Sequence, residues 1–218
     1  MKKYIADRKT KPILKYGLQR RTKAVIQQLQ RLDLPESCIL LDIGTADGLM
    51  LRSLIESLNS SRKIGIGIDT RFHSLRSAKE NVTYAIQADG RRLPFRTGRI
   101  NVIISTAVFK HIDGLQSCLT ECRRVLKMGG KIVATDPTPL GIHVGILLGH
   151  FSRRSIAQAL GLKATRQMLT RCDFKVLQAE RFMLCPIPFA GSDAIERTLK
   201  RAHLDQLFLD QVICASAC

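Results

Sequence analysis

The chain has 218 residues, which is enough for one β-sheet covered by helices and too few for two large domains. Its hydrophobic content of 45% is ordinary, and it has no internal repeat and no long low-complexity segment, so we expect a single soluble domain. Lys and Arg number 35 against 18 Asp and Glu, and the net charge of +17 is unusual for an enzyme that acts on small molecules.

Residues 1–34 are predicted to form a basic, amphipathic helical lead, followed by the main domain over 35–218. Ten Lys or Arg and one acid fall within residues 1–31, so more than half of the excess charge lies there. A helix is expected at about 11 to 33. Its apolar stripe consists of Leu14, Leu18, Val25, Leu29 and Leu32.

Three interpretations of this lead remain open on the sequence. The helix can pack on the domain with a solvated basic face, attach to an anionic membrane surface, or contact the phosphates of a nucleic acid. Met1-Lys-Lys-Tyr is not followed by the apolar core of a signal peptide, and an organelle presequence would normally be richer in Ser. We therefore expect a cytoplasmic protein, with peripheral contact to a membrane through residues 1–32 as an alternative.

The first predicted strand leads into a glycine-containing turn, Ile39-Leu-Leu-Asp-Ile-Gly-Thr-Ala-Asp-Gly48. Gly44 and Gly48 can adopt backbone conformations closed to other residues and let a ligand approach the main chain. A loop for a dinucleotide pyrophosphate needs backbone amides and no carboxylate at this point. Asp42 instead places negative charge where a cationic ligand is favoured, and S-adenosylmethionine, a sulfonium with an ammonium group, meets that requirement.

Two further strands are predicted to end in an acid. Arg62-Lys-Ile-Gly-Ile-Gly-Ile-Asp69 ends 21 residues beyond Gly48, an offset at which a carboxylate can bind both ribose hydroxyls. Thr70 is a plausible cap for the helix that follows. The strand Tyr84–Ala88 leads to Asp89, whose carboxylate could accept from an adenine amino group. Ligands of open α/β sheets bind beyond the carboxyl ends of the strands, so the three acids indicate one site.

These segments together resemble the class I S-adenosylmethionine-dependent methyltransferases, close to the group called methyltransferase type 11. The resemblance runs from about residue 38 to 137. It rests on Leu41-Asp-Ile-Gly-Thr-Ala-Asp-Gly48, Gly67-Ile-Asp69, Ala88-Asp89 with Leu93-Pro-Phe95, and Glu121-Cys-Arg-Arg-Val-Leu-Lys-Met-Gly-Gly130 before a strand over 131–135.

The resemblance implies that Asp42 and the loop through Gly48 hold the methionine end of S-adenosylmethionine, that Asp69 binds the ribose and that Asp89 lies beside the adenine. The full expected cofactor-binding set is Asp42, Gly44, Thr45, Ala46, Gly48, Asp69, Thr70, Asp89, Gly90 and Ser105. Ala46 stands where the family usually has a glycine, so the loop must avoid positive φ there or accept a modest strain. Asn101 replaces a common Asp at the start of the fourth strand, a position that is more often structural than catalytic.

Alternating strands and helices continue to about residue 136 and predict an α/β fold. We expect a Rossmann-like three-layer sandwich with a mainly parallel seven-stranded sheet and helices on both faces. The last two strand candidates lie near 173–182 and 206–216. The family resemblance implies that the final strand, over 207–215, is antiparallel.

An apolar segment follows the fifth strand, Pro139-Leu-Gly-Ile-His-Val-Gly-Ile-Leu-Leu-Gly-His-Phe151. It is shorter than the roughly 20 residues that span a bilayer. In the resembled family this position forms part of the acceptor pocket, so we expect a lid or acceptor-pocket insertion over about 138–171. A buried helix with two glycines for close packing is the alternative. If the segment is a lid, the substrate has a large apolar portion.

His111 is the leading candidate for a general base, because the unperturbed pKa of histidine lies near neutrality. A structural role, in which it orients the loop after the fourth strand, is the preferred interpretation. His143 and His150 could instead face the acceptor. The seven cysteines include no Cys-x-x-Cys pair, and they indicate a reduced compartment and core packing. Cys118 and Cys122 have no nearby metal-binding partners, so no metal site is predicted.

The sequence thus predicts methyl transfer from S-adenosylmethionine to a small-molecule or lipid-like acceptor with an apolar portion, by in-line displacement at the sulfonium methyl. The first alternative is an RNA-modifying methyltransferase. Against it, the fourth strand ends in Ser105-Thr-Ala-Val without the Asn/Asp-Pro-Pro-aromatic tetrad of enzymes that methylate base amino groups, and aromatic residues are few. The second alternative is a non-catalytic, cofactor-binding subunit.

Overall fold

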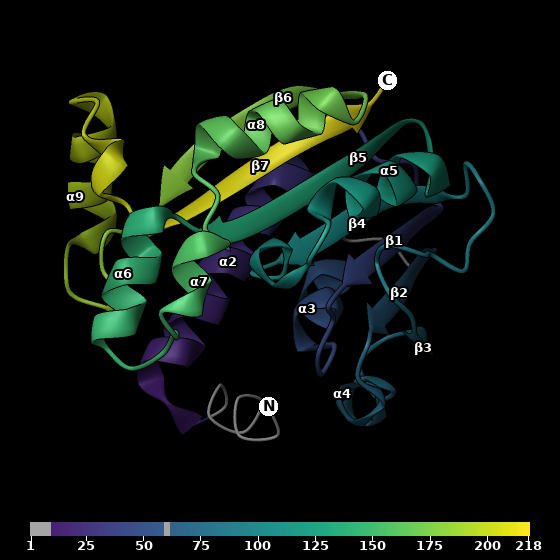
Figure 1. Cartoon of the computed structure of the whole chain (residues 1–218), viewed down its shortest axis with the longest axis horizontal. Coiled ribbons are helices and arrows are strands. Elements are labelled where there is room, and N and C mark those ends of the chain that lie inside the picture. The colour runs from purple at the N-terminus through teal and green to yellow at the C-terminus, as the bar shows by residue number, and fades with distance from the viewer. Residues whose placement is uncertain (1–9, 59–61) are drawn as a thin grey trace.

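The computed structural model describes residues 10–58 and 62–218, and their strands form one seven-stranded sheet in the order β3-β2-β1-β4-β5-β7-β6 (Figure 1). The elements are α2 (Pro12–Gln30), β1 (Cys38–Ile43), α3 (Leu49–Ser57), β2 (Lys63–Asp69), α4 (Phe72–Ala78), β3 (Tyr84–Gln87), β4 (Ile100–Thr106), the 3-10 turn η1 (Phe109–His111), α5 (Leu115–Val125), β5 (Leu126–Pro137), α6 (Pro139–Leu147), α7 (Arg154–Ala157), α8 (Leu162–Arg171), β6 (Phe174–Phe182), α9 (Ser192–Arg201), η2 (Asp205–Leu207) and β7 (Asp210–Ala217).

The sheet is mainly parallel and its last strand is antiparallel, as predicted. Strands β3, β2, β1, β4 and β5 pair in parallel, and β7 pairs antiparallel with both β5 and β6. β1 lies between β2 and β4, where Asp42 is level with Gly67 on one side and Ile104 on the other. This register brings the ends of the first, second and fourth strands to one edge of the sheet.

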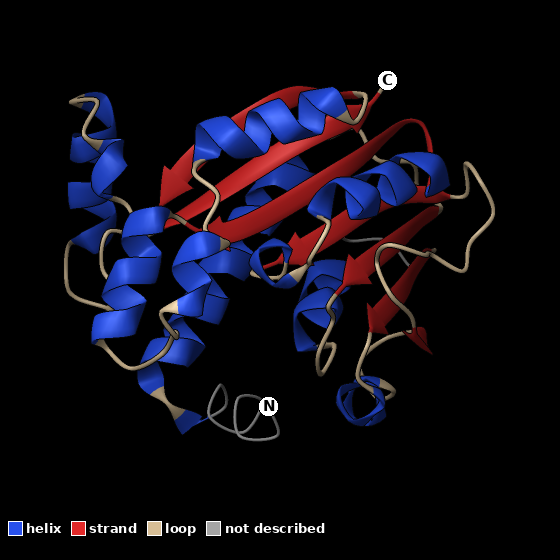
Figure 2. Ribbon diagram, viewed as in Figure 1, coloured by secondary structure: helices blue, strands red, loops and turns tan. Residues whose placement is uncertain are grey.

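Helices cover both faces of the sheet (Figure 2). Consecutive strand residues point to opposite faces, so Leu41 and Ile103 pack with α5 and α8, whereas Leu40 and Val102 pack with α2 and α3. In Figure 1, α5 and α8 lie in front of the sheet and α2 runs behind it. These two apolar layers are the core, and they hold the loops at the carboxyl ends of the strands.

The cysteines are free, and most of them pack in this core as expected. The buried ones are Cys38, Cys118, Cys122, Cys172 and Cys214, while Cys185 is half-buried and Cys218 is exposed. Burial raises the pKa of the Cys214 thiol to about 11, which keeps it protonated at neutral pH. Within residues 10–58 and 62–218, no three metal-ligating side chains lie close enough together to hold an ion.

The basic lead is a helix over the described part of its length, and it packs on the domain. Val25 and Leu29 of α2 are fully buried in the layer shared with α3. Arg20 forms ion pairs with Asp193 and Glu196 of α9. Val25 and Leu29 of the apolar stripe are therefore covered by protein, whereas Leu14 and Leu18 are half-buried. These contacts favour the first interpretation, packing on the domain, for residues 12–30. Residues 1–9 of the predicted lead lie outside the described part of the chain.

None of the helices in the described ranges is long and apolar enough to cross a membrane. α9 was not predicted from the sequence. Its buried residue is Glu196, whereas the apolar Ile195 is 44% exposed, so the apolar side of this helix does not mark its buried side.

Candidate active site

A cavity of about 950 Å³ lies at the carboxyl ends of the parallel strands. The ends of β1 and β2, the loop after β3 and the loop after β4 form one wall, and α2 and α6 contribute to the other. Figure 1 shows α2 and α6 on one side of these strand ends and α3 and α4 on the other. This is where ligands bind in open α/β sheets.

Most of the residues predicted from the sequence line this cavity. They are Gly44, Ala46, Asp69, Thr70, Asp89, Gly90 and His111. They come from four separate loops and are brought together only by the parallel pairing of β1 to β4. The other four predicted residues, Asp42, Thr45, Gly48 and Ser105, do not line it.

Those four residues lie behind the wall. Asp42 is 2% exposed within β1, and Ser105 is completely buried within β4. The side chain of Thr45 covers Gly67, where an added Cβ would lie 2.7 Å from the Thr45 hydroxyl oxygen. Gly48 adopts φ +73° at the start of α3. These four residues are buried and shape the loop behind the cavity wall.

In the turn after β1, the backbone packs closely against neighbouring segments. Gly44 has φ +77°, and a Cβ there would lie 2.4 Å from a methyl of Val108. The amides of Gly44 and Thr45 both donate to the carbonyl of Ile68, at 2.8 and 2.9 Å. Ala46 has φ +53°, so the loop does not avoid positive φ but accepts the strain. The turn is thereby fixed beside η1, because Val108 immediately precedes it.

The two acids on the cofactor side differ in their surroundings. One oxygen of Asp69 accepts the Arg71 amide at 2.9 Å, and the side chain stays at the cavity wall. Arg91 contacts both oxygens of Asp89, with its NH2 group 2.6 Å from Oδ2. This hydrogen bond lowers the pKa of Asp89 below its usual value and keeps it ionised. A carboxylate has about four acceptor positions, so Asp89 can still accept from an adenine amino group.

His111 lies on the cavity wall at the end of η1. Desolvation, followed by the nearby charges of Lys110 and Arg71, lowers its pKa to about 4. The imidazole is then neutral at physiological pH and is a weak proton acceptor. This favours the structural role over general base catalysis.

The segment after β5 forms α6, which borders the cavity through one face. Gly141, Val144 and Gly145 line the cavity, together with Leu148 beyond the helix. An added Cβ at Gly141 would lie 2.0 Å from the Leu209 carbonyl oxygen, so this glycine also permits close packing. One side of α6 therefore borders the cavity, as expected for a pocket insertion. Another side packs closely on the domain, as expected for a buried helix with glycines. His150 lines the cavity, whereas His143 is exposed and contacts the Pro139 carbonyl at 2.7 Å.

A buried cluster of charges at the acceptor side was not found by sequence reasoning. Lys110 of η1 is 5% exposed, and its ammonium nitrogen Nζ lies 3.7 Å from Oδ1 of Asp136, near the end of β5. Arg21 of α2 holds Asp210 of β7 through two hydrogen bonds of 3.0 Å. The available signal was Asp136, a fourth acid near a strand end, followed by Pro137.

Burial perturbs both members of the Lys110–Asp136 pair. Desolvation lowers the pKa of Lys110 to about 8, although Asp136 opposes this shift. Desolvation raises the pKa of Asp136 to about 6, although Lys110 and Arg21 oppose it. At pH 7 both groups are mainly charged, so they form an ion pair. Removing the two charges from water offsets part of the free energy gained from their attraction.

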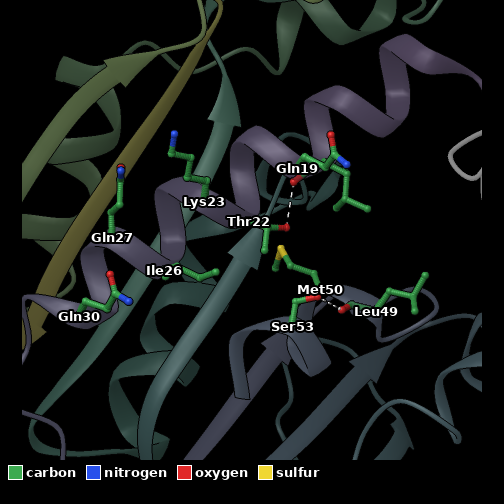
Figure 3. A pocket seen from close by; sticks show the side chains of 10 residues that line it. Gln19, Thr22, Lys23, Ile26, Gln27, Gln30, Leu49, Met50 and Ser53 are labelled. Atoms are coloured by element: carbon green, nitrogen blue, oxygen red, sulfur yellow. Dashed lines mark hydrogen bonds between the residues drawn. The ribbon is translucent and has the colours of Figure 1, made fainter. Parts of the chain in front are cut away.

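A second hollow, of about 460 Å³, lies between α2 and α3 and contains none of the predicted site residues (Figure 3). Thr22 and Ser53, which line it, donate to carbonyls of their own helices, those of Leu18 and Leu49. Its remaining lining consists of apolar and amide side chains and the exposed Lys23. It therefore offers no set of groups that converge on a ligand.

The strand order, the acids at one sheet edge and the cavity beside them define the class I S-adenosylmethionine-dependent methyltransferase fold. A chain of the complex between the Haloferax volcanii Trm112 methyltransferase activator and a protein described as a methyltransferase has a TM-score of 0.70 and 19% identity, covering 91% of this chain and 90% of that one. A SAM-dependent methyltransferase from Aquifex aeolicus has a TM-score of 0.64 and 13% identity, with coverage of 91% and 90%. At such identities these structures establish the fold.

Sequence comparison agrees with this fold. Residues 41–134 match the family model described as a methyltransferase domain. A malonyl-[acyl-carrier protein] O-methyltransferase from Coxiella burnetii is 28% identical over 85% of this chain, and this chain spans 66% of that protein, just under two thirds of its length. Residues 41–134 thus match a methyltransferase domain, and the relatives and solved structures that the chain resembles are S-adenosylmethionine-dependent methyltransferases.

Proposed function

We propose that the protein transfers a methyl group from S-adenosylmethionine to a small-molecule or lipid-like acceptor that has an apolar portion. One observation carries the proposal: a single cavity joins the acid-bearing sheet edge to apolar residues of α2 and α6. Leu14 and Leu18 of α2 and Val144 of α6 are among these residues, and Leu148 and Met183, which follow α6 and β6, extend the apolar surface. An acceptor bound against them lies next to the cofactor loops.

In this proposal the Gly44–Ala46 turn holds the methionine end, Asp69 binds the ribose hydroxyls and Asp89 lies beside the adenine, with Thr70 and Gly90 completing the wall. The cofactor supplies an activated methyl group on a sulfonium, so the protein needs to align the acceptor and exclude water. The apolar side chains of α6 support the second requirement.

The cofactor part of the proposal is tested by calorimetry with S-adenosylhomocysteine, the demethylated product. We expect binding in the micromolar range. Asp69→Ala should weaken it at least tenfold through loss of the ribose hydrogen bonds, and Asp33→Ala, an exposed acid outside the cavity, should leave it unchanged. The absence of binding at protein concentrations far above micromolar would contradict the proposal.

The acceptor is tested by transfer of radiolabelled methyl groups into a cell extract that is then separated into lipid, small-molecule and RNA fractions. Label in the lipid or small-molecule fraction supports the proposal, and label in RNA supports the RNA-modifying alternative. Label in none of them, with cofactor binding intact, supports the non-catalytic alternative. The Coxiella burnetii relative is named for methylating malonyl-[acyl-carrier protein]. Carrier-bound acyl groups are therefore collected in a fourth, protein fraction, and label there that is released by cleavage of the thioester also supports the proposal.

A further inference from the structure

The acceptor side of the cavity presents a cation and a second polar atom that the cofactor residues do not use. Lys110 lines the cavity, and its side chain is 4% exposed. His150 also lines the cavity, and its Nε2 is buried without a hydrogen-bond partner among the described residues. The ring of Phe151, the next residue after His150, is centred 5.5 Å from Lys110 Nζ, so the chain segment that carries His150 passes beside Lys110.

Lys110 has donor capacity to spare. An ammonium group carries three N–H donors and no acceptor. One donor of Lys110 is satisfied by the Ala107 carbonyl at 2.6 Å. Asp136 lies at 3.7 Å, beyond hydrogen-bond range, and its Oδ1 has no hydrogen-bond partner within the described ranges. A ligand atom that meets Lys110 in the cavity must therefore be a hydrogen-bond acceptor, which means oxygen and not an ammonium nitrogen.

The charge balance of the wall favours a negatively charged oxygen. Lys110 and Arg21 are matched by Asp136 and Asp210, so the cluster is neutral when all four are ionised. The sulfonium of the cofactor then adds one positive charge that this wall does not offset. A carboxylate would supply the missing negative charge, whereas an ammonium would add repulsion in a poorly solvated site.

Lys110 belongs to the segment after β4 that packs against the turn proposed to hold the methionine end of the cofactor. Val108, two residues earlier, packs directly against Gly44 of the turn proposed to hold the methionine end. Val144, Leu148 and Phe151 line the same part of the chain's cavity and provide an apolar surface beside the polar atoms.

We propose that Lys110 Nζ and His150 Nε2 bind the carboxylate of an acyl chain, and that this carboxylate is the methyl acceptor. The proposal rests on the proposed function and names its substrate class. The carboxylate oxygen forms the bond to the methyl carbon, and the carbon–sulfur bond breaks with its electron pair on sulfur. The products are a methyl ester and a neutral thioether, and no proton moves. A general base is therefore not required, in keeping with the low pKa of His111.

The test is calorimetry at pH 7 with octanoate, 1-octanol and octylamine, each titrated into protein saturated with S-adenosylhomocysteine. We expect octanoate to bind at least tenfold more tightly than octanol, and octylamine not to bind. Octanol binding as tightly as octanoate, or the absence of octanoate binding to the cofactor-loaded protein, would overturn the proposal. The initial titration with S-adenosylhomocysteine tests the proposed function separately, so failure of the two is distinguishable.

The variant Lys110→Met/Asp136→Asn removes the cation without leaving a buried carboxylate unpaired. It should lose the preference for octanoate over octanol while S-adenosylhomocysteine affinity stays within twofold, which also shows that the variant is folded. Lys163→Met, an exposed lysine of α8, is the matched control and should retain the preference. His150→Leu should weaken octanoate several-fold, and His150→Gln, which keeps an N–H donor, should restore part of the affinity. Undiminished octanoate preference in the double variant would refute the role of Lys110.

Discussion

Ala46 is the residue at which this chain departs from its family's glycine pattern, and the structure shows the consequence. Its φ of +53° lies in the left-handed region, which costs a residue with a side chain about 1–2 kcal/mol. The neighbouring Gly44 and Gly48 occupy the same region without that cost. The sequence was sufficient to identify this position. Only the backbone angles show that the loop adopts positive φ at Ala46 and is strained there.

Ala46→Gly should therefore stabilise the protein. Relief of the strain, reduced by the greater entropy of glycine in the unfolded chain, should raise the free energy of unfolding by about 0.5–1 kcal/mol. Urea denaturation measures the change. Ala24→Gly is the control, because Ala24 is equally buried but lies inside α2, where glycine should cost about 1 kcal/mol. A loss of stability in both variants would argue against strain at Ala46.

The Lys110–Asp136 pair gives a pH-dependent prediction. Asp136 has a raised pKa of about 6 in the folded protein, so between pH 5 and 7 the folded state binds more protons than the unfolded state. Stability from this group is therefore lost as pH rises through that window, by about 1 kcal/mol. Arg21 and Asp210 are the other charges near the pair, and the comparison below leaves both unchanged.

Comparison of wild type with Lys110→Met/Asp136→Asn by urea denaturation at pH 5 and pH 7 isolates this effect. The variant should gain about 1 kcal/mol on the wild type between the two pH values, because it has no carboxylate at position 136 to ionise. Asp193→Asn, an exposed acid of α9, should give the same difference from wild type at both pH values. A double variant whose free energy of unfolding falls relative to that of the wild type as the pH rises would contradict the expected sign.

At the scale of elements, α2 is held on the domain by ion pairs and side-chain hydrogen bonds as well as by apolar contacts. Arg21 reaches Asp210 of β7, which is 1% exposed in its side chain, and Gln28 donates to Glu180 of β6 at 3.0 Å. A chain shortened to begin near Leu32 would therefore lose part of the core and these bonds together. Charge substitutions within α2 separate its structural role from any role in binding.

Arg21→Gln should destabilise the protein by about 3 kcal/mol, because it leaves the buried carboxylate of Asp210 without its counter-ion. Lys23→Gln is the matched control from the same helix: its side chain is 59% exposed, and the change should stay within about 0.5 kcal/mol. Thermal and urea unfolding measure both. Adding Asp210→Asn to Arg21→Gln should recover part of the loss, and no recovery would mean that Arg21 acts through packing alone.

The strands that the sequence predicted well are those in which an apolar run is followed by an acidic residue. β2 ends at Asp69 and β3 begins at Tyr84, as the pattern indicated. The charged cluster was not predictable in the same way, because Arg21 and Asp210 are 189 residues apart and meet only through the antiparallel β7. α9 was missed for a related reason: its inward residue is Glu196, whose carboxylate pairs with Arg20 of α2 and accepts the Leu184 amide.

At the scale of the molecule, the βα units produce a parallel sheet, and the parallel sheet determines where the cavity lies. Parallel strands bring their carboxyl ends to one edge, so the sequence alone is sufficient to place the acids Asp69 and Asp89 together. It is not sufficient for the acceptor wall, which is assembled from α2, η1 and α6, elements that are far apart in the chain. The shape of that wall depends on packing and not on a local pattern.

The net charge of +17 should limit the stability of the whole fold. Repulsion among the unpaired cations is stronger in the compact state than in the unfolded chain, and the Debye length falls from about 30 Å at 0.01 M salt to about 8 Å at 0.15 M. We therefore expect the midpoint of thermal unfolding at pH 7 to rise as sodium chloride increases from 0.01 to 0.3 M. Near the sequence pI of about 10.1 the net charge vanishes, and this rise should largely disappear. A midpoint that falls with salt at pH 7 would instead mean that ion pairs such as Arg21–Asp210 outweigh the general repulsion.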